Sequence, residues 1–171
     1  RRTRRRTVVR AFVGALLVLM ALGALLAALL LHRPADYQPA VPSAPGQEVS
    51  PYLTHYLGPQ VHNNIQVDRP FEVIVDQEQL NQLIVDGETL GWQWPVSLSG
   101  VVFSAPVVVL SDAGITIMGG VDIGVEIVVS ITASPTLDAS GLFHLNVQSV
   151  KAGAVNVTKL ARAVGSQIVA A

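Results

Sequence analysis

The chain has 171 residues, half of them hydrophobic, with 11 basic residues, 12 acidic residues and no cysteine. Without cysteine, disulfide bonds, thiolate nucleophiles and thiolate metal sites are excluded. Five basic residues but all twelve acidic residues follow Leu31, a balance of −7 that argues against nucleic acid as a partner.

The first predicted element is a membrane-spanning helix over residues 11–31, in which no side chain is polar. At about 1.5 Å per residue, its length matches a hydrocarbon core of roughly 30 Å. Residues 1–10 hold six of the eleven basic residues and are predicted to form a cytoplasmic tail. We therefore expect a single-pass protein of the cytoplasmic (inner) membrane, with its N-terminus inside and its C-terminal domain extracytoplasmic.

A cleaved signal peptide is the alternative for this segment. The apolar region of a signal peptide is usually about 7–15 residues long and ends near small residues of the A-x-A type. Here the run is longer and ends at Leu31-His32-Arg33-Pro34, without such a site. The small-residue pairs Gly23/Ala27 and Ala24/Ala28 would let two anchors self-associate.

Residues 32–50 are predicted to be a tether, because five of the ten prolines lie between Arg33 and Pro51. Each proline fixes φ at about −65° and removes a donor, so the segment should be extended and semi-rigid. At about 3.1 Å per residue, it would hold the domain up to roughly 50 Å from the membrane. A polyproline ligand for a partner protein is the alternative.

Residues 51–171 are predicted to fold as one extracytoplasmic domain, since about 120 residues suit a single core. In chain order we expect a helix from Ser50-Pro51 to about Gly58, a strand over Phe71–Val75, and a helix over Gln77–Val85 that Asp76 caps.

The strongest pattern runs from Ile115 to Ala133, where every odd position is apolar or Gly and most polar residues are even. Such alternation predicts one long strand, or two collinear strands, with the odd face buried. Gly119, Gly120 and Gly124 would permit curvature or a bulge. Flanking strands over Val101–Leu110 and Phe143–Val147, and a final helix from about Thr158, complete the pattern.

The predicted fold class is α+β, a curved antiparallel sheet of three to five long strands packed with two or three helices. A long sheet with an apolar concave face must close over a helix, a partner or an apolar ligand. Residues 107–110 are apolar on both faces, and Val128 interrupts the polar face near the end of the long strand. The candidate ligand-binding groove therefore consists of Val107, Val109, Leu110, Val128 and Ile131. The alternative is that the helices over Gln77–Val85 and Thr158–Ile168 fill the concavity.

Five short segments, in this order, carry a family resemblance: Pro70–Val75, Gln77–Asn81, Ile115–Gly119, Gly141–Leu145 and Val150–Ala154. Together with the anchor, they resemble the strand, "Q/E-x-L-N" helix and Gly-containing strands of YpmS-like (DUF2140-type) membrane-anchored bacterial proteins. The order is also similar to LmeA-like lipid-binding proteins with a TULIP-like fold, and to planctomycete hypothetical proteins. The resemblance implies a cell-envelope protein whose curved sheet holds lipid, and it assigns no catalytic residue.

The residues themselves suggest no catalytic site, metal site or cofactor. His55, His62 and His144 are scattered, and no nucleophile motif or phosphate loop is present. Trp92 and Trp94 are candidates for contact with a partner or the membrane interface, or they cap the core. We therefore expect a non-enzymatic protein that binds membrane lipid or another apolar ligand; the alternative is an adaptor subunit of an envelope assembly without a small-molecule ligand.

Overall fold

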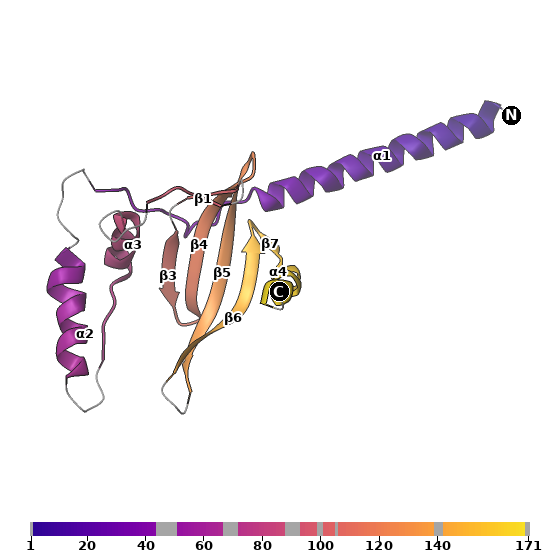
Figure 1. Cartoon of the computed structure of the whole chain (residues 1–171). Coiled ribbons are helices and arrows are strands. Elements are labelled where there is room, and N and C mark those ends of the chain that lie inside the picture. The colour runs from indigo at the N-terminus through magenta and orange to yellow at the C-terminus, as the bar shows by residue number, and fades with distance from the viewer. Residues whose placement is uncertain are drawn as a thin grey trace.

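The computed structural model describes residues 2–43, 51–66, 72–87, 93–98, 101–104, 106–138 and 142–169. These residues form an α+β fold with an antiparallel sheet that is not closed, which confirms the predicted class (Figure 1). The helices are α1 (Arg2–Leu30), η1 (Tyr52–Leu57), α2 (Gly58–Ile65), α3 (Gln77–Val85) and α4 (Thr158–Val169). The strands are β1 (Val96–Leu98), β2 (Val101–Phe103), β3 (Val107–Ser111), β4 (Gly114–Asp122), β5 (Glu126–Leu137), β6 (Phe143–Ala152) and β7 (Val155–Asn156).

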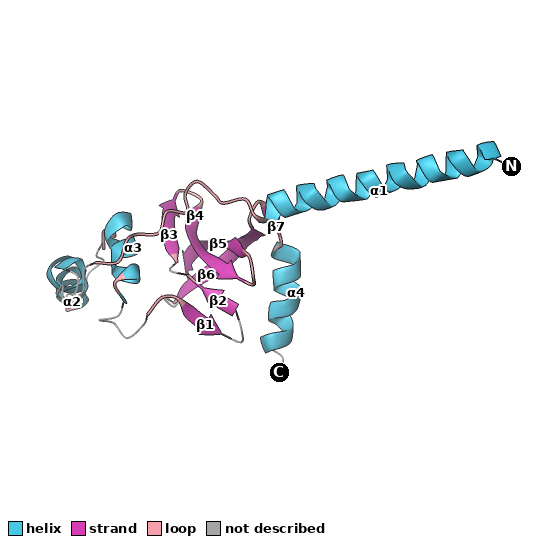
Figure 2. Ribbon diagram, turned by 90° about the horizontal axis from the view of Figure 1, so that it is seen from above, coloured by secondary structure: helices cyan, strands magenta, loops and turns pink. Residues whose placement is uncertain are grey.

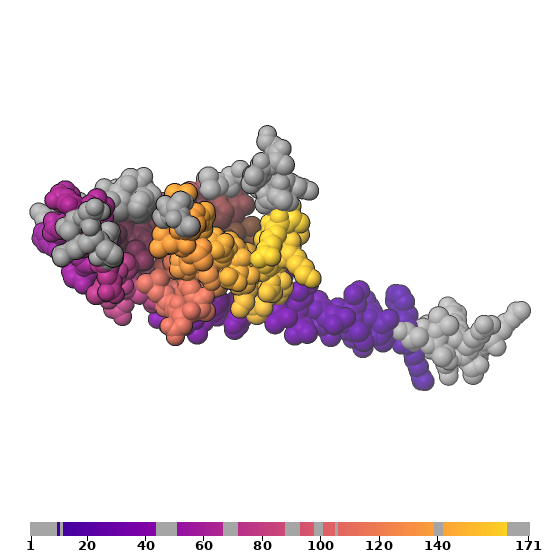
Figure 3. Space-filling model, turned by 90° about the horizontal axis from the view of Figure 1, so that it is seen from below, coloured from indigo at the N-terminus to yellow at the C-terminus, as the bar shows by residue number. Residues whose placement is uncertain are grey.

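The helix α1 is long and apolar enough over Phe12–Leu30 to cross a membrane. It extends away from the rest of the molecule as an isolated helix, with its apolar side chains exposed (Figure 3). Its last turn contacts the domain, because Ala154 donates its backbone N–H to the Leu29 carbonyl at 2.8 Å. Gly153 makes this approach possible, since its φ is +55° and a side chain there would collide with the Leu29 and Leu30 carbonyls. The helix end is therefore fixed to the β6–β7 turn.

Residues 33–43, which we call the strap, lie along the sheet. The predicted free spacer is therefore wrong for this part of the tether. Nor is the strap extended throughout, because the Tyr37 N–H donates to the Pro34 carbonyl at 3.1 Å across a turn. Residues 44–50 lie outside the described residues. Tyr37 is only 3% exposed and packs with Val107, Met118 and Val128. One aromatic side chain thus converts a Pro-rich segment into part of the core.

The far end of the strap is bound to α3. Ser43 donates its backbone N–H and its hydroxyl to the two carboxylate oxygens of Asp86, each at 2.7 Å. Gln82 donates to the Val41 carbonyl at 3.0 Å and to Asp86 at 2.9 Å. Burial of the Asp86 carboxyl raises its pKa, but the hydrogen bonds from Ser43 and Gln82 outweigh this, so the pKa lies below its ordinary value.

The segment 72–76 is extended but pairs with no strand, so the predicted strand over Phe71–Val75 is wrong for its described part. Side chains of η1 and α2 take its backbone donors instead. The Asp76 N–H donates to the Tyr52 hydroxyl at 2.8 Å, and the Ile74 N–H donates to Gln60 at 3.3 Å. Phe71 and Ser50 lie outside the described residues.

The helix α3 begins as predicted, because the Asp76 carboxylate accepts the Gln79 N–H at 2.9 Å. It covers the outer edge of β3 through side-chain amides. Asn81 donates to the Val108 carbonyl at 2.8 Å and accepts the Val108 N–H at 2.7 Å, while Gln77 accepts the Leu110 N–H at 2.7 Å. Gln77 and Asn81 are four residues apart in the helix, and Leu110 and Val108 are two residues apart in the strand. Both spacings correspond to about 6–7 Å, so each side-chain amide lies opposite one of the two strand residues.

The sheet has the order β1-β2-β4-β5-β6-β7, and β3 pairs with β4 as well. The strands β2 and β3 therefore lie one after the other along the same edge of β4, interrupted near Ser104 and Pro106. The predicted strand over Val101–Leu110 is thus two strands. The second of these, β3, pairs with β4 through the turn at residues 111–114.

The prediction of one long strand, or of two collinear strands, from Ile115 to Ala133 is wrong. The segment is the hairpin of β4 and β5, with Ile115 opposite Ala133 and Ile117 opposite Ile131. The turn is fixed by Gly124, whose φ is +101° and whose N–H donates to Asp122 at 2.8 Å. Odd residues pair with odd residues, so the alternation continues across the turn without a break.

The buried face of this hairpin is the opposite of the predicted one. Met118, Gly120, Val128 and Ser130, all even, are buried, whereas Ile117 and Ile131 are exposed on the odd face. Ala133, at the end of the pattern, is an odd residue that is buried. The strap with Tyr37 covers the even face, while α3 lies beside β3 and α4 lies beside β6 (Figure 2). In the described part of the chain, the odd face therefore keeps an open apolar pocket.

We predict that Tyr37→Phe destabilises the protein by about 1–3 kcal/mol, because the buried Gly120 N–H loses its acceptor. Unfolding of the full chain in nanodiscs, followed by near-ultraviolet circular dichroism, measures the change. Tyr56→Phe is the matched control, since Tyr56 is 45% exposed and only stacks on Tyr52. Equal stability of Tyr37→Phe and wild type would contradict the role of this hydroxyl.

We also predict a pH-dependent contribution from Asp86. Because its folded pKa is lowered, the stabilisation is complete above the unfolded pKa of about 4 and is lost as pH falls through the folded pKa. Asp86→Asn should lower stability by about 1 kcal/mol at neutral pH and approach wild type at strongly acidic pH. Unfolding measured across this range tests it, with Asp112→Asn in an exposed turn as the control. A constant difference at all pH values would contradict the prediction.

Candidate apolar ligand site

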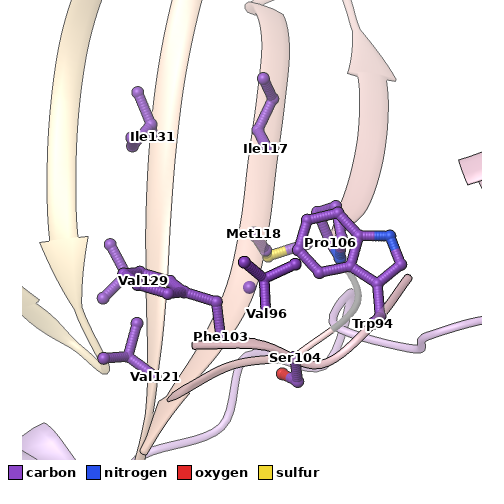
Figure 4. Close-up of a pocket in the computed structure, with 11 residues that line it drawn as sticks. Trp94, Val96, Phe103, Ser104, Pro106, Ile117, Met118, Val121, Val129 and Ile131 are labelled. Carbon is purple, nitrogen blue, oxygen red and sulfur yellow. The ribbon is translucent and has the colours of Figure 1, made fainter. Parts of the chain in front are cut away.

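The odd face of the β4–β5 hairpin carries a pocket of about 410 Å³, within the range of roughly 300–1,000 Å³ typical of small-molecule sites (Figure 4). Its described lining residues are Trp94, Val96, Phe103, Ser104, Pro106, Ile117, Met118, Gly119, Val121, Val129 and Ile131. Among these, Ser104 is the one with a polar side chain other than the Trp94 indole. The pocket is therefore suited to an apolar group.

The floor of the pocket follows from the register of the hairpin. Gly119 lies opposite Val129, and Ile117 lies opposite Ile131, so these side chains share one face. The β1–β2 hairpin forms a wall, because Val96 pairs with Phe103, and Phe103 pairs with Val121 of β4.

Trp94 closes the pocket on the α3 side (Figure 4). Its indole N–H donates to the Ile84 carbonyl at 3.1 Å, near the C-terminal end of α3. This bond satisfies the polar atom of the ring and leaves the apolar ring edge against the pocket. Trp94 is thus positioned by a helix terminus, not by the sheet.

The polar groups at the base of the pocket are already paired. The Ser104 hydroxyl lies 3.0 Å from the Tyr37 hydroxyl and donates to the Gly120 carbonyl at 3.2 Å. Among the described residues, no buried side-chain nitrogen or oxygen lacks a hydrogen-bond partner. A polar headgroup would therefore find no unpaired hydrogen-bonding side chain among these residues, and it would have to remain outside the pocket.

The apolar surface continues beyond the pocket along β5 and β6. Ala133 pairs with Val147, Pro135 with Leu145, and Leu137 with Phe143. Leu137 is 73% exposed and Phe143 is 60% exposed. We call the exposed residues Leu137, Phe143, Leu145 and Val147 the distal ribbon.

The five predicted groove residues do not form one groove. Ile131 lines the pocket, but Val107 and Val128 lie in the core against Tyr37, with Val109 packed beside them. Leu110 lies one position on from Val109 and therefore points to the other face of β3. Both faces of β3 are apolar, as the sequence indicates, but the strap covers one of them.

The remaining sequence predictions fare unequally. Trp94 lines the pocket, whereas Trp92 lies outside the described residues. Sequence reasoning missed Val96, Phe103 and Gly119 as lining residues. The odd-position alternation carried the signal for the floor, but only the hairpin and the strap reveal that this face is open.

The histidines considered as metal ligands are not brought together in the described part of the chain. In the described part of the chain, no group of three or more His, Cys, Asp or Glu residues is placed to hold a metal ion. His144 lies 2.9 Å from Asp138 on an exposed part of the sheet, and His62 lies 2.9 Å from Gln66 in and beside α2. These pairs are separate surface contacts.

Comparisons with protein-family models, with curated proteins and with solved structures found no match. The family resemblance of the five short segments thus stays a prediction.

We predict that the neighbouring glycines of β4 respond oppositely to alanine. At Gly119 an added Cβ meets only the Ser104 carbonyl, at 3.8 Å, so Gly119→Ala should keep or raise stability by up to about 1 kcal/mol. At Gly120 it would collide with the Ser104 hydroxyl and lie 3.2 Å from the Tyr37 hydroxyl, so Gly120→Ala should cost about 1–3 kcal/mol. Denaturant unfolding of both variants measures the difference, and equal stabilities would contradict the assignment of the two faces.

Proposed function

We propose that this chain is a single-pass membrane protein whose extracytoplasmic domain binds the acyl chain of a lipid, or another apolar ligand, in the pocket over Gly119. The observation that carries the proposal is an apolar face of the sheet left open while the more polar face is covered by the strap. Exposed apolar surface of this extent is costly in water, and an occupant removes that cost.

The energetics favour an alkyl chain. Each buried methylene contributes about 0.8 kcal/mol, which is about a fourfold gain in affinity per carbon while the pocket has room. The hydroxyl of Ser104 is already bonded, so the site would gain nothing from a polar group at its base. A headgroup would sit at the mouth, and selectivity would rest on chain length.

The proposed source of such a ligand is the membrane, because the pocket lies near the end of α1. Val129 lines the pocket and pairs with Ala152, two residues before Ala154, which contacts the end of α1. The pocket therefore lies at the end of the sheet where α1 leaves it. If α1 spans the membrane, that end faces the lipid headgroups.

The topology and compartment belong to the same proposal. The six basic residues before the apolar run favour a cytoplasmic N-terminus, and the acidic remainder would lie on the opposite side of the inner membrane. The YpmS-like and LmeA-like resemblance supports an envelope protein that binds lipid without catalysis. We propose no enzymatic role.

A second candidate function is that of an adaptor in an envelope assembly. It is favoured by the distal ribbon, whose Leu137, Phe143 and Leu145 are all well exposed and lie beyond the pocket. Apolar side chains exposed together on a sheet face are typical of protein-binding surfaces. In this case the ribbon would meet a partner while the pocket stayed empty.

Photolabelling tests the two candidates. The full chain is reconstituted into vesicles that contain a phospholipid with a diazirine in its acyl chain, and cross-linked peptides are mapped by mass spectrometry. Lipid binding predicts labels on peptides containing Phe103 or Ile131, in addition to labels on α1, which serve as the internal reference.

The pocket-filling variant Gly119→Leu should lose most of the domain label and keep the α1 label, because its side chain occupies the floor of the pocket. Ser97→Leu, at an exposed position of the adjacent hairpin, is the matched control and should be labelled like wild type. Labels confined to α1 in the wild type would overturn lipid binding. Labels on the pocket peptides that Gly119→Leu leaves unchanged would overturn the assigned site.

A further inference from the structure

The last helix, α4, lies crosswise to α1 and on the side of the sheet toward which α1 runs. Both ribbon views agree on this placement: α4 is seen nearly along its axis in Figure 1 and from its side in Figure 2. The chain connection is short, because α4 begins at Thr158, four residues after the Ala154 that contacts Leu29. If α1 crosses a membrane, α4 lies along the surface of that membrane.

The helix is held in this position by the sheet. The Thr158 hydroxyl accepts the Val150 N–H at 2.8 Å, and Arg162 donates to the Val147 carbonyl at 3.0 Å. Arg162 therefore faces β6. Leu160 is two positions away, about 200° around the helix, and so faces away from the sheet. Its side chain is 65% exposed.

The charge of this region differs from that of the rest of the outer domain. All twelve acidic residues precede residue 139, whereas residues 142–171 contain Lys151, Lys159 and Arg162 and no acid. Lys151, Lys159 and Arg162 are exposed. The acidic domain thus presents a basic surface beside the end of α1, together with an exposed leucine. This combination is typical of helices that lie in the interface of an anionic bilayer.

We propose that α4 docks on the outer surface of the membrane that α1 spans, with Leu160 among the headgroups and Lys159 at lipid phosphates. The inference rests on the membrane-spanning role of α1 but not on the apolar pocket. Docking of α4 gives the domain a second attachment, which fixes how the sheet is oriented to the bilayer. Without this second attachment, α1 could tilt in the bilayer and carry the domain, which is bound to its end, along with it.

The absence of native cysteine allows single labels in the full chain. Leu160→Cys, carrying the fluorophore NBD, is reconstituted into vesicles of phosphatidylcholine and phosphatidylglycerol in equal parts, with or without nitroxide-labelled lipid. Leu137→Cys is the matched control, because Leu137 is 73% exposed, slightly more than Leu160, but belongs to the distal ribbon. We expect strong nitroxide quenching at 160 and little at 137.

Removal of one positive charge should weaken docking on the anionic surface. Adding Lys159→Gln to the Leu160→Cys protein should reduce the ratio of docked to undocked helix about fivefold in these vesicles. The same substitution should have little effect in pure phosphatidylcholine, where no anionic lipid is present. Quenching at 160 no greater than at 137 would overturn the proposal, as would a Lys159→Gln variant that docks like its parent on anionic vesicles.

Retention of the protein through alkaline extraction of the vesicles separates the possible failures. A retained protein with an unquenched label at 160 overturns the docking of α4 alone and leaves lipid binding in the pocket standing. A protein that alkali releases has no spanning α1, and both proposals then fall.

Discussion

The insertion of Tyr37 between the strap and the sheet is the constraint on which the rest of the structure depends. Its hydroxyl accepts the Gly120 N–H at 2.9 Å and lies 3.0 Å from the Ser104 hydroxyl, at the place where β2 gives way to β3. Its ring packs on Val107, Met118 and Val128. A gap in the edge of the sheet is thereby filled by a residue only seven positions after Leu30, the end of α1. The core of the domain and the end of α1 are therefore joined by a short segment that is itself part of the core.

This constraint decides which face of the sheet is available. The strap can cover only one face, and Tyr37 directs it to the even one, where Gly120 leaves room for two hydroxyl groups. Met118 and Val128 are buried there, although the even face is the more polar in sequence. Among the described residues, the odd face, rich in Ile and Val, is contacted by the small β1–β2 hairpin and Trp94 at one end. An open apolar pocket is therefore the direct result of where the chain leaving α1 is bound.

The sequence was sufficient for the long apolar helix, the α+β class and the capped helix after Asp76, because each has a local signal: uninterrupted apolarity, period-two alternation, and an Asx cap. It could not reveal the hairpin within Ile115–Ala133, since pairing of odd with odd residues preserves the alternation across the turn. Nor could it reveal the strap. Proline content predicts extension, but whether an extended segment stands free or packs depends on a distant contact, here between Tyr37 and Gly120. The pocket walls formed by Phe103 and Trp94 depend on the same long-range folding of the chain.

The contact between α1 and the β6–β7 turn has a consequence for how such a protein would act. The end of α1, the pocket and the start of α4 lie close together. The Leu29 carbonyl contacts the turn at Gly153, the pocket residue Val129 pairs with Ala152 just before that turn, and α4 begins a few residues after it. An anchor on a free tether would leave the pocket at any angle to the bilayer, so that a lipid chain would have to cross water to reach it. An anchor that ends on the sheet itself, with a basic helix beside it, would hold the apolar face at one height and one tilt. The distance an acyl chain must travel out of the membrane would then be set by the docking of the domain, and the flexibility of the tether would no longer limit it.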